Sequence, residues 1–349
     1  MNIFTQIIKG ITKNFTLIEE DSNILDILNN IQNLKENTKI SNKEYYGQYL
    51  FLTLVYGVIY CKDRYIITHK KEFIDTINNC INTLLTDSDF IMYDKIMWKE
   101  SPTILNTHKT HLTYISNVSL AILYYIEISK DTKYNTILNS ICEDLYNKMQ
   151  DSYLIHSFPK KPIWVGDNIV GALVLYKYGK LFNNKKYLTF VSKFINYLKN
   201  NCLNDKGILY SIIPTNDYKY YKTPIIKGSL LAYSVYFLLQ IDYKFGYDQY
   251  QKILKYLSGY IEVGFLTSGM VIRESLNSNY HKTKFATGDG GIIVNGLGSV
   301  ATLFTHGCAK LVGDTKTKDS IKSTMLCALP IIPNKYKSIP FIKIALNTL

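Results

Sequence analysis

Arginine is nearly missing from this chain of 349 residues, and the distribution of its positive charge bears on whether it binds nucleic acid. Only Arg64 and Arg273 are arginines among 40 basic residues, so the formal net charge of +12 comes almost entirely from lysine. The lysines are scattered, whereas a nucleic-acid-binding protein concentrates its positive charge in a stripe or a recognisable module. We therefore expect a solvated lysine surface and no nucleic-acid partner.

Long apolar segments are missing as well. The longest, such as residues 228–241, are interrupted by Ser, Tyr and Gln and stay below the roughly 20 residues that a membrane-spanning helix needs. The N-terminal residues contain neither the continuous apolar core nor the small-residue cleavage site of a secretory signal. The sequence thus predicts no transmembrane segment and no secretory signal.

Cysteine is present six times but never as a CxxC pair, which argues against a zinc ribbon, and we expect no metal site. Most of the cysteines lie in apolar helical patterns, where a free thiol behaves as a small core residue. Free thiols suit a reducing compartment, so a cytoplasmic location is expected. No GxGxxG follows a strand, and the P-loop, HExxH and GxSxG motifs are absent, so we expect no cofactor.

The chain does contain an internal repeat, with copies that begin at His111, Trp164 and Lys227. Each copy has a short polar or glycine-marked entry, an apolar stretch long enough for a helix, a turn, and an amphipathic stretch. In each copy a tyrosine follows the entry residue by 23 positions; these tyrosines are Tyr134, Tyr187 and Tyr250. A fixed internal offset indicates a repeated supersecondary unit.

Five such helical-hairpin units can be placed between residues 45 and 330, with further N-terminal helices in residues 1–40. The first helix of each unit is apolar on all sides, which is typical of a helix packed on both faces, and the second is amphipathic. The pattern predicts an inner ring of buried helices and an outer ring of half-exposed ones. Short segments rich in β-branched and aromatic residues follow the outer helices, after Asp89, Asp151, Asp205 and Gly264, and predict β-hairpins on one rim.

This layout resembles the (α/α)6-toroid proteins of the six-hairpin glycosidase-like superfamily, over about residues 40–330. The resemblance depends on the repeat and on the motifs WVGDN at Trp164, KGSLL at Lys227, RES at Arg273 and GDGG at Gly288. It implies a single all-α domain, residues 1–349, in which the N-terminal helices close the ring. It also implies a cavity at one end of the inner helices, lined by the loops that enter them.

Carried onto this chain, the resemblance places a set of residues at the entries or just before the last one. These are Tyr45, Tyr46, His111, Tyr114, Trp164, Asp167, Asn168, Lys227, Arg273, Glu274 and Asp289. We expect Asp167, Asp289 and Glu274 to be catalytic and the other eight to bind substrate.

The acids each have two interpretations. Asp167 follows Trp and Gly at a helix start, which would offer a stacking surface for a sugar, but Asp is also a preferred N-cap. Asp289 lies among glycines that allow a tight turn, and a capping turn explains it equally well. Arg273 could supply a bidentate fork to a substrate carboxylate or phosphate, or to Glu274, or it could form an ordinary salt bridge. Two carboxylates are the minimum for glycoside hydrolysis.

His111 and His156 lie nearest the predicted rim and could act as acid or base, although a lone loop histidine is more often only polar. With 30 tyrosines in the chain, any one of Tyr45, Tyr46 and Tyr114 more often packs than binds substrate.

Three functions remain open at this point. The first is a carbohydrate- or glycoconjugate-active enzyme that catalyses hydrolysis, elimination or epimerisation. The second is a dehydratase or isomerase on a small hydrophobic alcohol, similar to the linalool dehydratase-isomerase branch. That branch uses acidic, Tyr, His and Cys groups in its cavity, whereas no cysteine stands at an inner-helix entry of this chain. The third is a non-catalytic toroid that binds or scaffolds, because fold alone does not supply function.

Overall fold

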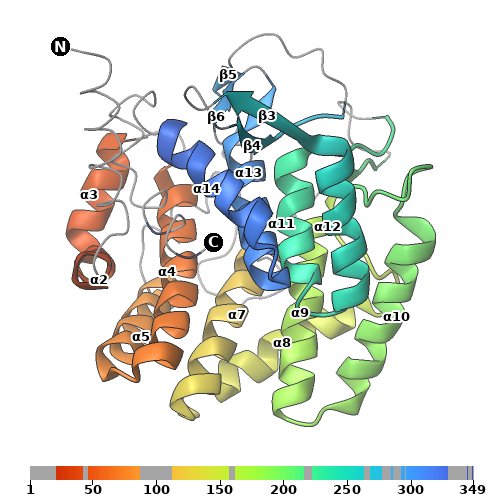
Figure 1. The fold of residues 1–349 in the computed structure, drawn as a ribbon. Coiled ribbons are helices and arrows are strands. Elements are labelled where there is room, and N and C mark those ends of the chain that lie inside the picture. Colours follow the sequence, from red (N-terminus) through yellow and green to blue (C-terminus); the bar gives the residue numbers. More distant parts are fainter. Residues whose placement is uncertain are drawn as a thin grey trace, which may run out of the picture.

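The computed structural model describes residues 21–41, 46–86, 112–156, 162–215, 222–262, 268–276, 284–285, 292–294 and 296–328, with Ile344 and Thr348. These residues form twelve helices and seven short strands, and most of the helices follow one another as the predicted pairs (Figure 1). No helix within the described ranges is long and apolar enough to cross a membrane.

The five predicted hairpin units are all present. Their first helices are α4 (Tyr46–Thr68), α7 (Leu112–Ser129), α9 (Val165–Leu181), α11 (Gly228–Leu238) and α13 (Ser299–Val312). Their second helices are α5 (Lys71–Thr86), α8 (Asn135–Met149), α10 (Lys185–Asn201), α12 (Tyr243–Leu257) and α14 (Thr315–Ala328). Successive first helices contact one another from α4 to α13, and each second helix packs on the first helix of its own unit.

Burial separates the two rings as the sequence predicted. In α9, 13 of 17 residues are buried, whereas in α10 only 6 of 17 are buried, and these recur at the helical period from Tyr187 to Leu198. A helix that is apolar all round must be covered on every side, while an amphipathic helix can leave its lysine face in water. The first helices therefore form the inner ring and the second helices the outer one.

The repeated tyrosines do not occupy one structural position. Tyr134 is the N-cap of α8, Tyr187 is the third residue of α10, and Tyr250 lies in the middle of α12. The reason is that α11 has 11 residues where α9 has 17, so a constant offset falls further along the outer helix. All three are buried, and the offset marks the repeat without marking an equivalent site.

Helices α2 (Asp21–Asn29) and α3 (Ile31–Ser41), and Thr348 near the end of the chain, contact the first unit. Helix α2 packs on α5, and α3 packs on α4. Thr348 connects the first and last inner helices, because its hydroxyl donates to Tyr56 O (3.4 Å) and its carbonyl accepts from Lys310 Nζ (2.9 Å). The expectation that residues 1–40 close the ring stays a prediction.

The strands are short, antiparallel and mostly at the N-terminal end of the inner helices. Strand β1 (Ile163–Trp164) pairs with β2 (Ile212–Ile213), and β3 (Ser258–Glu262) pairs with β4 (Ser268–Ile272). Strands β5 (Lys284–Phe285), β6 (Ile292–Val294) and β7 (Leu297–Gly298) form a third sheet. Residues 151–156, expected to be strand-like, form a turn and irregular structure, and the strand expected after Asp89 lies outside the described residues.

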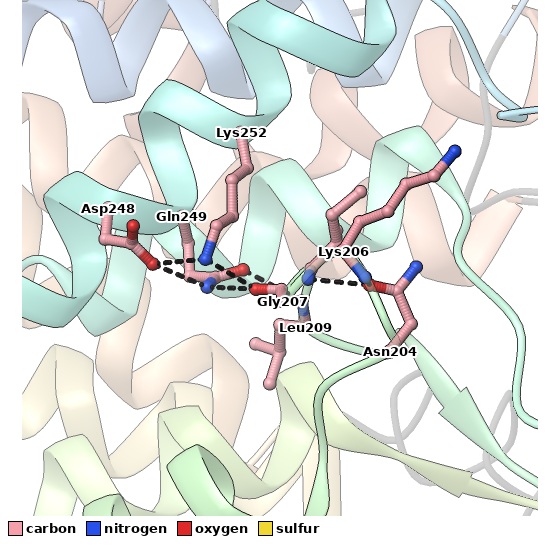
Figure 2. A network of polar contacts seen from close by, with 8 residues as sticks. Asn204, Lys206, Gly207, Leu209, Asp248, Gln249 and Lys252 are labelled. Atoms are coloured by element: carbon pink, nitrogen blue, oxygen red, sulfur yellow. Dashed lines mark hydrogen bonds and ion pairs between the residues drawn. The ribbon is translucent and has the colours of Figure 1, made fainter.

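The segment that leads from α10 to β2 is held by an amide side chain of α12. Gln249 is fully buried; its Oε1 accepts from Leu209 N (2.8 Å) and its Nε2 donates to Gly207 O (2.9 Å). Lys252 Nζ donates to the same carbonyl at 2.7 Å (Figure 2). Gly207 has a φ of +70°, a left-handed conformation that suits glycine. The turn is thereby fixed to the neighbouring unit.

Aromatic side chains fill the space between the inner helices. The Phe304 ring of α13 lies edge-on to three tyrosine rings, with centroids 5.3 Å away for Tyr233, 5.8 Å for Tyr56 and 6.0 Å for Tyr236. Burial raises the pKa of the Tyr56 and Tyr236 hydroxyls, so both remain neutral. The region where α4, α11 and α13 meet is therefore packed core.

Candidate active site

Asp167 lies in the first turn of α9. The helix begins after Trp164, which occupies the N-cap position in an extended conformation and makes no side-chain cap. Asp167 is therefore the third residue of the helix and does not act as its N-cap, and it is only 5% exposed. The hydroxyl of Thr113, the second residue of α7, donates a hydrogen bond of 2.6 Å to Asp167 Oδ2. Asp167 thus joins the starts of two inner helices.

Thr113 was missed by the sequence reasoning, which chose His111 and Tyr114 in the same entry. Tyr114 turns toward the outer ring: its hydroxyl donates to Leu84 O at the end of α5, and its ring stacks on Phe51 at 5.0 Å. The expected substrate-binding role of Tyr114 stays untested, but its contacts anchor α7 to α4 and α5.

One sequence signal could have pointed to Thr113: it lies four residues before Asn117, so the two polar side chains share one face of a mostly apolar helix. Asn117 lies one turn further along the same face of α7, and its Nδ2 donates to Thr113 O (2.8 Å) and to the Tyr233 hydroxyl of α11 (3.3 Å). Tyr233 in turn lies against Gly166, where an added Cβ would come within 2.8 Å of its ring. Gly166 therefore permits the close approach of α9 and α11 beside Asp167.

Asn168 is completely buried and holds the backbone of the preceding loop. Its Oδ1 accepts from Ile155 N (2.9 Å), and its Nδ2 donates to Ile155 O and Trp164 O, both at 3.0 Å. These bonds engage both the oxygen and the nitrogen of the side-chain amide. The geometry therefore gives Asn168 a part in shaping the entry of α9.

Glu274 follows β4 and lies between the starts of α11 and α13. Its Oε1 accepts from the Ser229 hydroxyl (2.6 Å) and its Oε2 from Ser229 N (3.0 Å), in the first turn of α11. At Gly298, the N-cap of α13, an added Cβ would lie 2.9 Å from Glu274 Oε2. Donors directed at both oxygens suit an ionised carboxylate. Glu274 thus links the entries of α11 and α13.

Arg273 points to the other side of the chain from these contacts. Its Nε lies 3.6 Å from the position that a Cβ would take at Gly259 of β3, so the glycine leaves room for the guanidinium. Within the described ranges it forms no ion pair with Glu274 or any other acid. The salt bridge weighed from the sequence is therefore absent from this part of the structure.

Two further predicted residues are partly exposed at the same end. Trp164 belongs to β1, and Lys227 is the N-cap of α11. Tyr45, His111 and Asp289 lie outside the described residues, as does the side chain of Tyr46. In the part of the chain that is described, no group of three or more His, Cys, Asp or Glu side chains could hold a metal ion.

The arrangement brings two of the predicted acids to adjoining helix starts. Asp167 joins α7 to α9, and Glu274 joins α11 to α13, while α9 and α11 contact each other between them. Paired carboxylates in such a setting can transfer protons to and from a bound substrate. Both carboxylates lie at the N-terminal end of the inner helices, so a substrate that contacts both would bind at that end.

No protein-family model matches the chain, and no curated protein matches it. Solved structures do. A possible member of family GH105 from Salmonella enterica serovar Paratyphi A aligns with a TM-score of 0.56 and 12% identity, over 91% of this chain and 92% of that one. The GH76A α-1,6-mannanase from Salegentibacter sp. HEL1_6 aligns with a TM-score of 0.55 and 11% identity, over 91% and 97%.

An inactive variant of that mannanase was solved in complex with α-1,6-mannotetrose, and it aligns with a TM-score of 0.54 and 12% identity over the same shares of the two chains. At these identities the likeness concerns the fold. The chain has an (α/α)6-toroid fold, which it shares with these solved structures.

Proposed function

We propose that this protein is a carbohydrate-active enzyme that cleaves a glycosidic bond at the N-terminal end of its inner helices. The observation that carries the proposal is the pair Asp167 and Glu274, fixed at neighbouring helix starts by Thr113 and Ser229. Glycoside hydrolases and a mannanase that share the fold support the substrate class.

The two acids would divide the chemistry. Glu274, whose two oxygens already accept hydrogen bonds, acts as the base or nucleophile, and Asp167 protonates the departing glycosidic oxygen. Asp289 is the third candidate acid, and Trp164 offers a ring on which a sugar can stack. Elimination also breaks the glycosidic bond, with one group that removes a proton and one that protonates the departing oxygen, so it belongs to the same proposal, whereas epimerisation leaves that bond intact and does not.

Arg273 and Lys227 favour a substrate that carries an acidic group. Both are cationic, and both stand where the backbones of β4 and α11 meet, since Gly228 N donates to Glu274 O at 2.9 Å. Neither side chain forms an ion pair within the described ranges. A guanidinium binds a carboxylate with two parallel hydrogen bonds, so Arg273→Lys should weaken binding of an acidic glycan more than of a neutral one.

The test is a turnover assay on neutral and acidic oligosaccharides, with α-1,6-mannotetraose and unsaturated uronyl disaccharides included. Asp167→Asn, Glu274→Gln and Asp289→Asn are compared with Asp319→Asn, which changes an exposed acid of α14. We expect Asp167→Asn and Glu274→Gln each to lose on the order of 10²-fold or more in kcat, and Asp319→Asn to lose nothing. Unchanged turnover in both Asp167→Asn and Glu274→Gln would overturn the proposal.

A second function is favoured by one specific observation. Because Glu274 accepts hydrogen bonds from the first turn of α11, it has the geometry of a helix-capping acid in a toroid that binds glycans without cleaving them. Binding of an oligosaccharide without any turnover, and with equal affinity in Glu274→Gln, would support that function.

A further inference from the structure

Ser211 occupies the junction between the entries of α9 and α11. It immediately precedes β2 and is 1% exposed. Its carbonyl accepts from Val165 N, the first residue of α9, at 3.0 Å. Its hydroxyl accepts from Lys227 N (3.0 Å) and donates to Lys227 O (3.1 Å), at the N-cap of α11. One residue therefore binds both helix starts.

The two candidate acids lie close to these bonds in the chain. Asp167 comes two residues after Val165, and Ser229, which holds Glu274, comes two residues after Lys227. The first turn of a helix moves with its first residue, so the placement of each carboxylate follows the placement of the residue bound to Ser211. The position of Asp167 relative to Glu274 therefore depends on Ser211.

Ser211 is itself held in place by bonds from its own backbone and from the residues just before it. Its N–H donates to Ile225 O (2.9 Å), and Leu209, two residues earlier, is held by Gln249 of α12 (Figure 2). If Ser211 lay on a mobile loop, it would move with the starts of α9 and α11. Because its segment is anchored, Ser211 can determine the distance between these two helix starts.

The other two junctions are built in the same way. Thr113 and Asp167 connect α7 to α9, and Glu274 lies between α11 and α13. Ser211 completes the series, because its backbone carbonyl holds the start of α9 and its hydroxyl holds the start of α11, so each pair of adjoining entries from α7 to α13 is connected through a polar residue. Among the three bridges, Ser211 is the one that carries no charge and so has no acid–base chemistry of its own.

We propose that Ser211 is a positioning residue that sets the distance between Asp167 and Glu274. Its catalytic meaning rests on the proposed function, but its structural effect does not. In Ser211→Ala, Lys227 N–H loses its acceptor in a buried place, while Lys227 O still accepts from Leu231 N (2.8 Å). The α11 entry then loses a hydrogen bond to the residue that also holds the start of α9, while the bond from Gly228 N to Glu274 O remains.

The experiment compares Ser211→Ala with Ser211→Thr, which keeps the hydroxyl, and with Ser119→Ala. Ser119 is a fully buried serine of α7 whose hydroxyl has no partner in the described part of the chain, so it controls for the loss of a buried hydroxyl. If Ser211→Ala does not fold, Ser211→Cys takes its place, because a thiol is a weaker acceptor of similar shape.

Hydrogen exchange is measured first, on peptides covering residues 165–169 and 227–231. Ser211→Ala removes the hydroxyl that binds Lys227 and keeps the carbonyl that accepts from Val165 N, so we expect faster exchange at residues 227–231 and near wild-type exchange at residues 165–169. Ser211→Thr should restore wild-type rates, and Ser119→Ala should change neither peptide. With a substrate from the glycan panel, Ser211→Ala should lose about tenfold or more in kcat with little change in KM, because misplacement by about an ångström is enough.

The outcomes separate the two proposals. Faster exchange at residues 227–231 in a protein whose wild type cleaves no glycan sinks the proposed function and leaves the positioning role standing. Wild-type kcat in Ser211→Ala, in a protein that does cleave glycans, sinks the positioning role alone. Unchanged exchange at residues 227–231, or equal effects in Ser119→Ala, also overturns it.

Discussion

The Thr113 hydroxyl donates a hydrogen bond of 2.6 Å to Asp167 Oδ2 and so connects the first turn of α7 to the first turn of α9. Two inner helices that are far apart along the chain thereby share one acid. The bond orients the carboxylate that we propose as the proton donor.

Thr113→Val should reduce turnover without unfolding the protein. Valine keeps the shape of threonine and removes the donor, so Asp167 loses one hydrogen bond that fixes its rotamer. We expect kcat to fall about tenfold, and Thr113→Ser, which keeps the hydroxyl, to stay within about twofold of wild type. Equal kinetics for Thr113→Val and Thr113→Ser would show that the hydrogen bond does not serve the reaction.

Gly228 allows α11 to start directly against β4. An added Cβ would lie 2.0 Å from the carbonyl oxygen of Arg273, a backbone atom that cannot turn aside. Gly228→Ala should therefore lower the free energy of unfolding by about 3 kcal/mol, measured by denaturant titration.

Gly313 is the matched control for that substitution. It has a φ of +74° but no atom near its Cβ position within 4 Å, so Gly313→Ala pays only for the left-handed backbone, about 1–2 kcal/mol. If Gly313→Ala is the more destabilising of the two, the close contact at Gly228 is not what fixes the start of α11.

Asp242 caps α12 and makes stability depend on acid pH. Burial raises the pKa of its carboxyl, but hydrogen bonds from Lys199 Nζ (2.6 Å) and Phe245 N (3.0 Å) outweigh burial and hold that pKa below its ordinary value of 3.8. A carboxyl with a lowered folded pKa stabilises the protein above the unfolded pKa, and this stabilisation is lost as the pH falls through the folded pKa.

Asp242→Ala should therefore lower the free energy of unfolding by about 1 kcal/mol at pH 7, and by progressively less below pH 3.8. Urea unfolding at a series of pH values measures both effects. Asp319→Ala, at an exposed acid, should show neither. A deficit in Asp242→Ala that stays constant down to the lowest pH would contradict this assignment.

Five thiols should resist modification in the folded protein. Cys61, Cys80, Cys142, Cys202 and Cys308 are buried, and burial raises the pKa of each thiol, to about 12 for Cys80 and Cys202. In Cys327→Ser we expect no reaction with Ellman's reagent at pH 8 until denaturant is added, and then five equivalents. Rapid reaction of the native variant would show that the helix pairs open readily.

The inner and outer rings of helices could be predicted from sequence, because the spacing of apolar residues in each helix indicates which of its faces are buried. The all-apolar stretch from Val165 and the amphipathic stretch from Lys185 fold as inner and outer helices for the reason their patterns indicate. The same logic fails at the entries, where residues meet across units. Thr113 and Ser211 are ordinary small polar residues in the sequence, and only the approach of α7, α9 and α11 gives them partners.

The sequence also could not orient neighbouring side chains in the entries. Thr113 and Tyr114 are adjacent, yet one faces Asp167 and the other faces Leu84 and Phe51, because consecutive residues on a helix point about 100° apart. A choice between them needs the direction of the helix axis, which tertiary packing supplies.

The most direct measurement is a crystal structure of Asp167→Asn with a bound oligosaccharide that the wild type cleaves. We expect the scissile glycosidic oxygen to lie within hydrogen-bonding reach of residue 167, with Glu274 on the other side of the anomeric carbon. A carboxyl separation near 5 Å would indicate retention, and one of roughly 6.5–9.5 Å inversion. An oligosaccharide bound away from both residues would contradict the assignment of these acids.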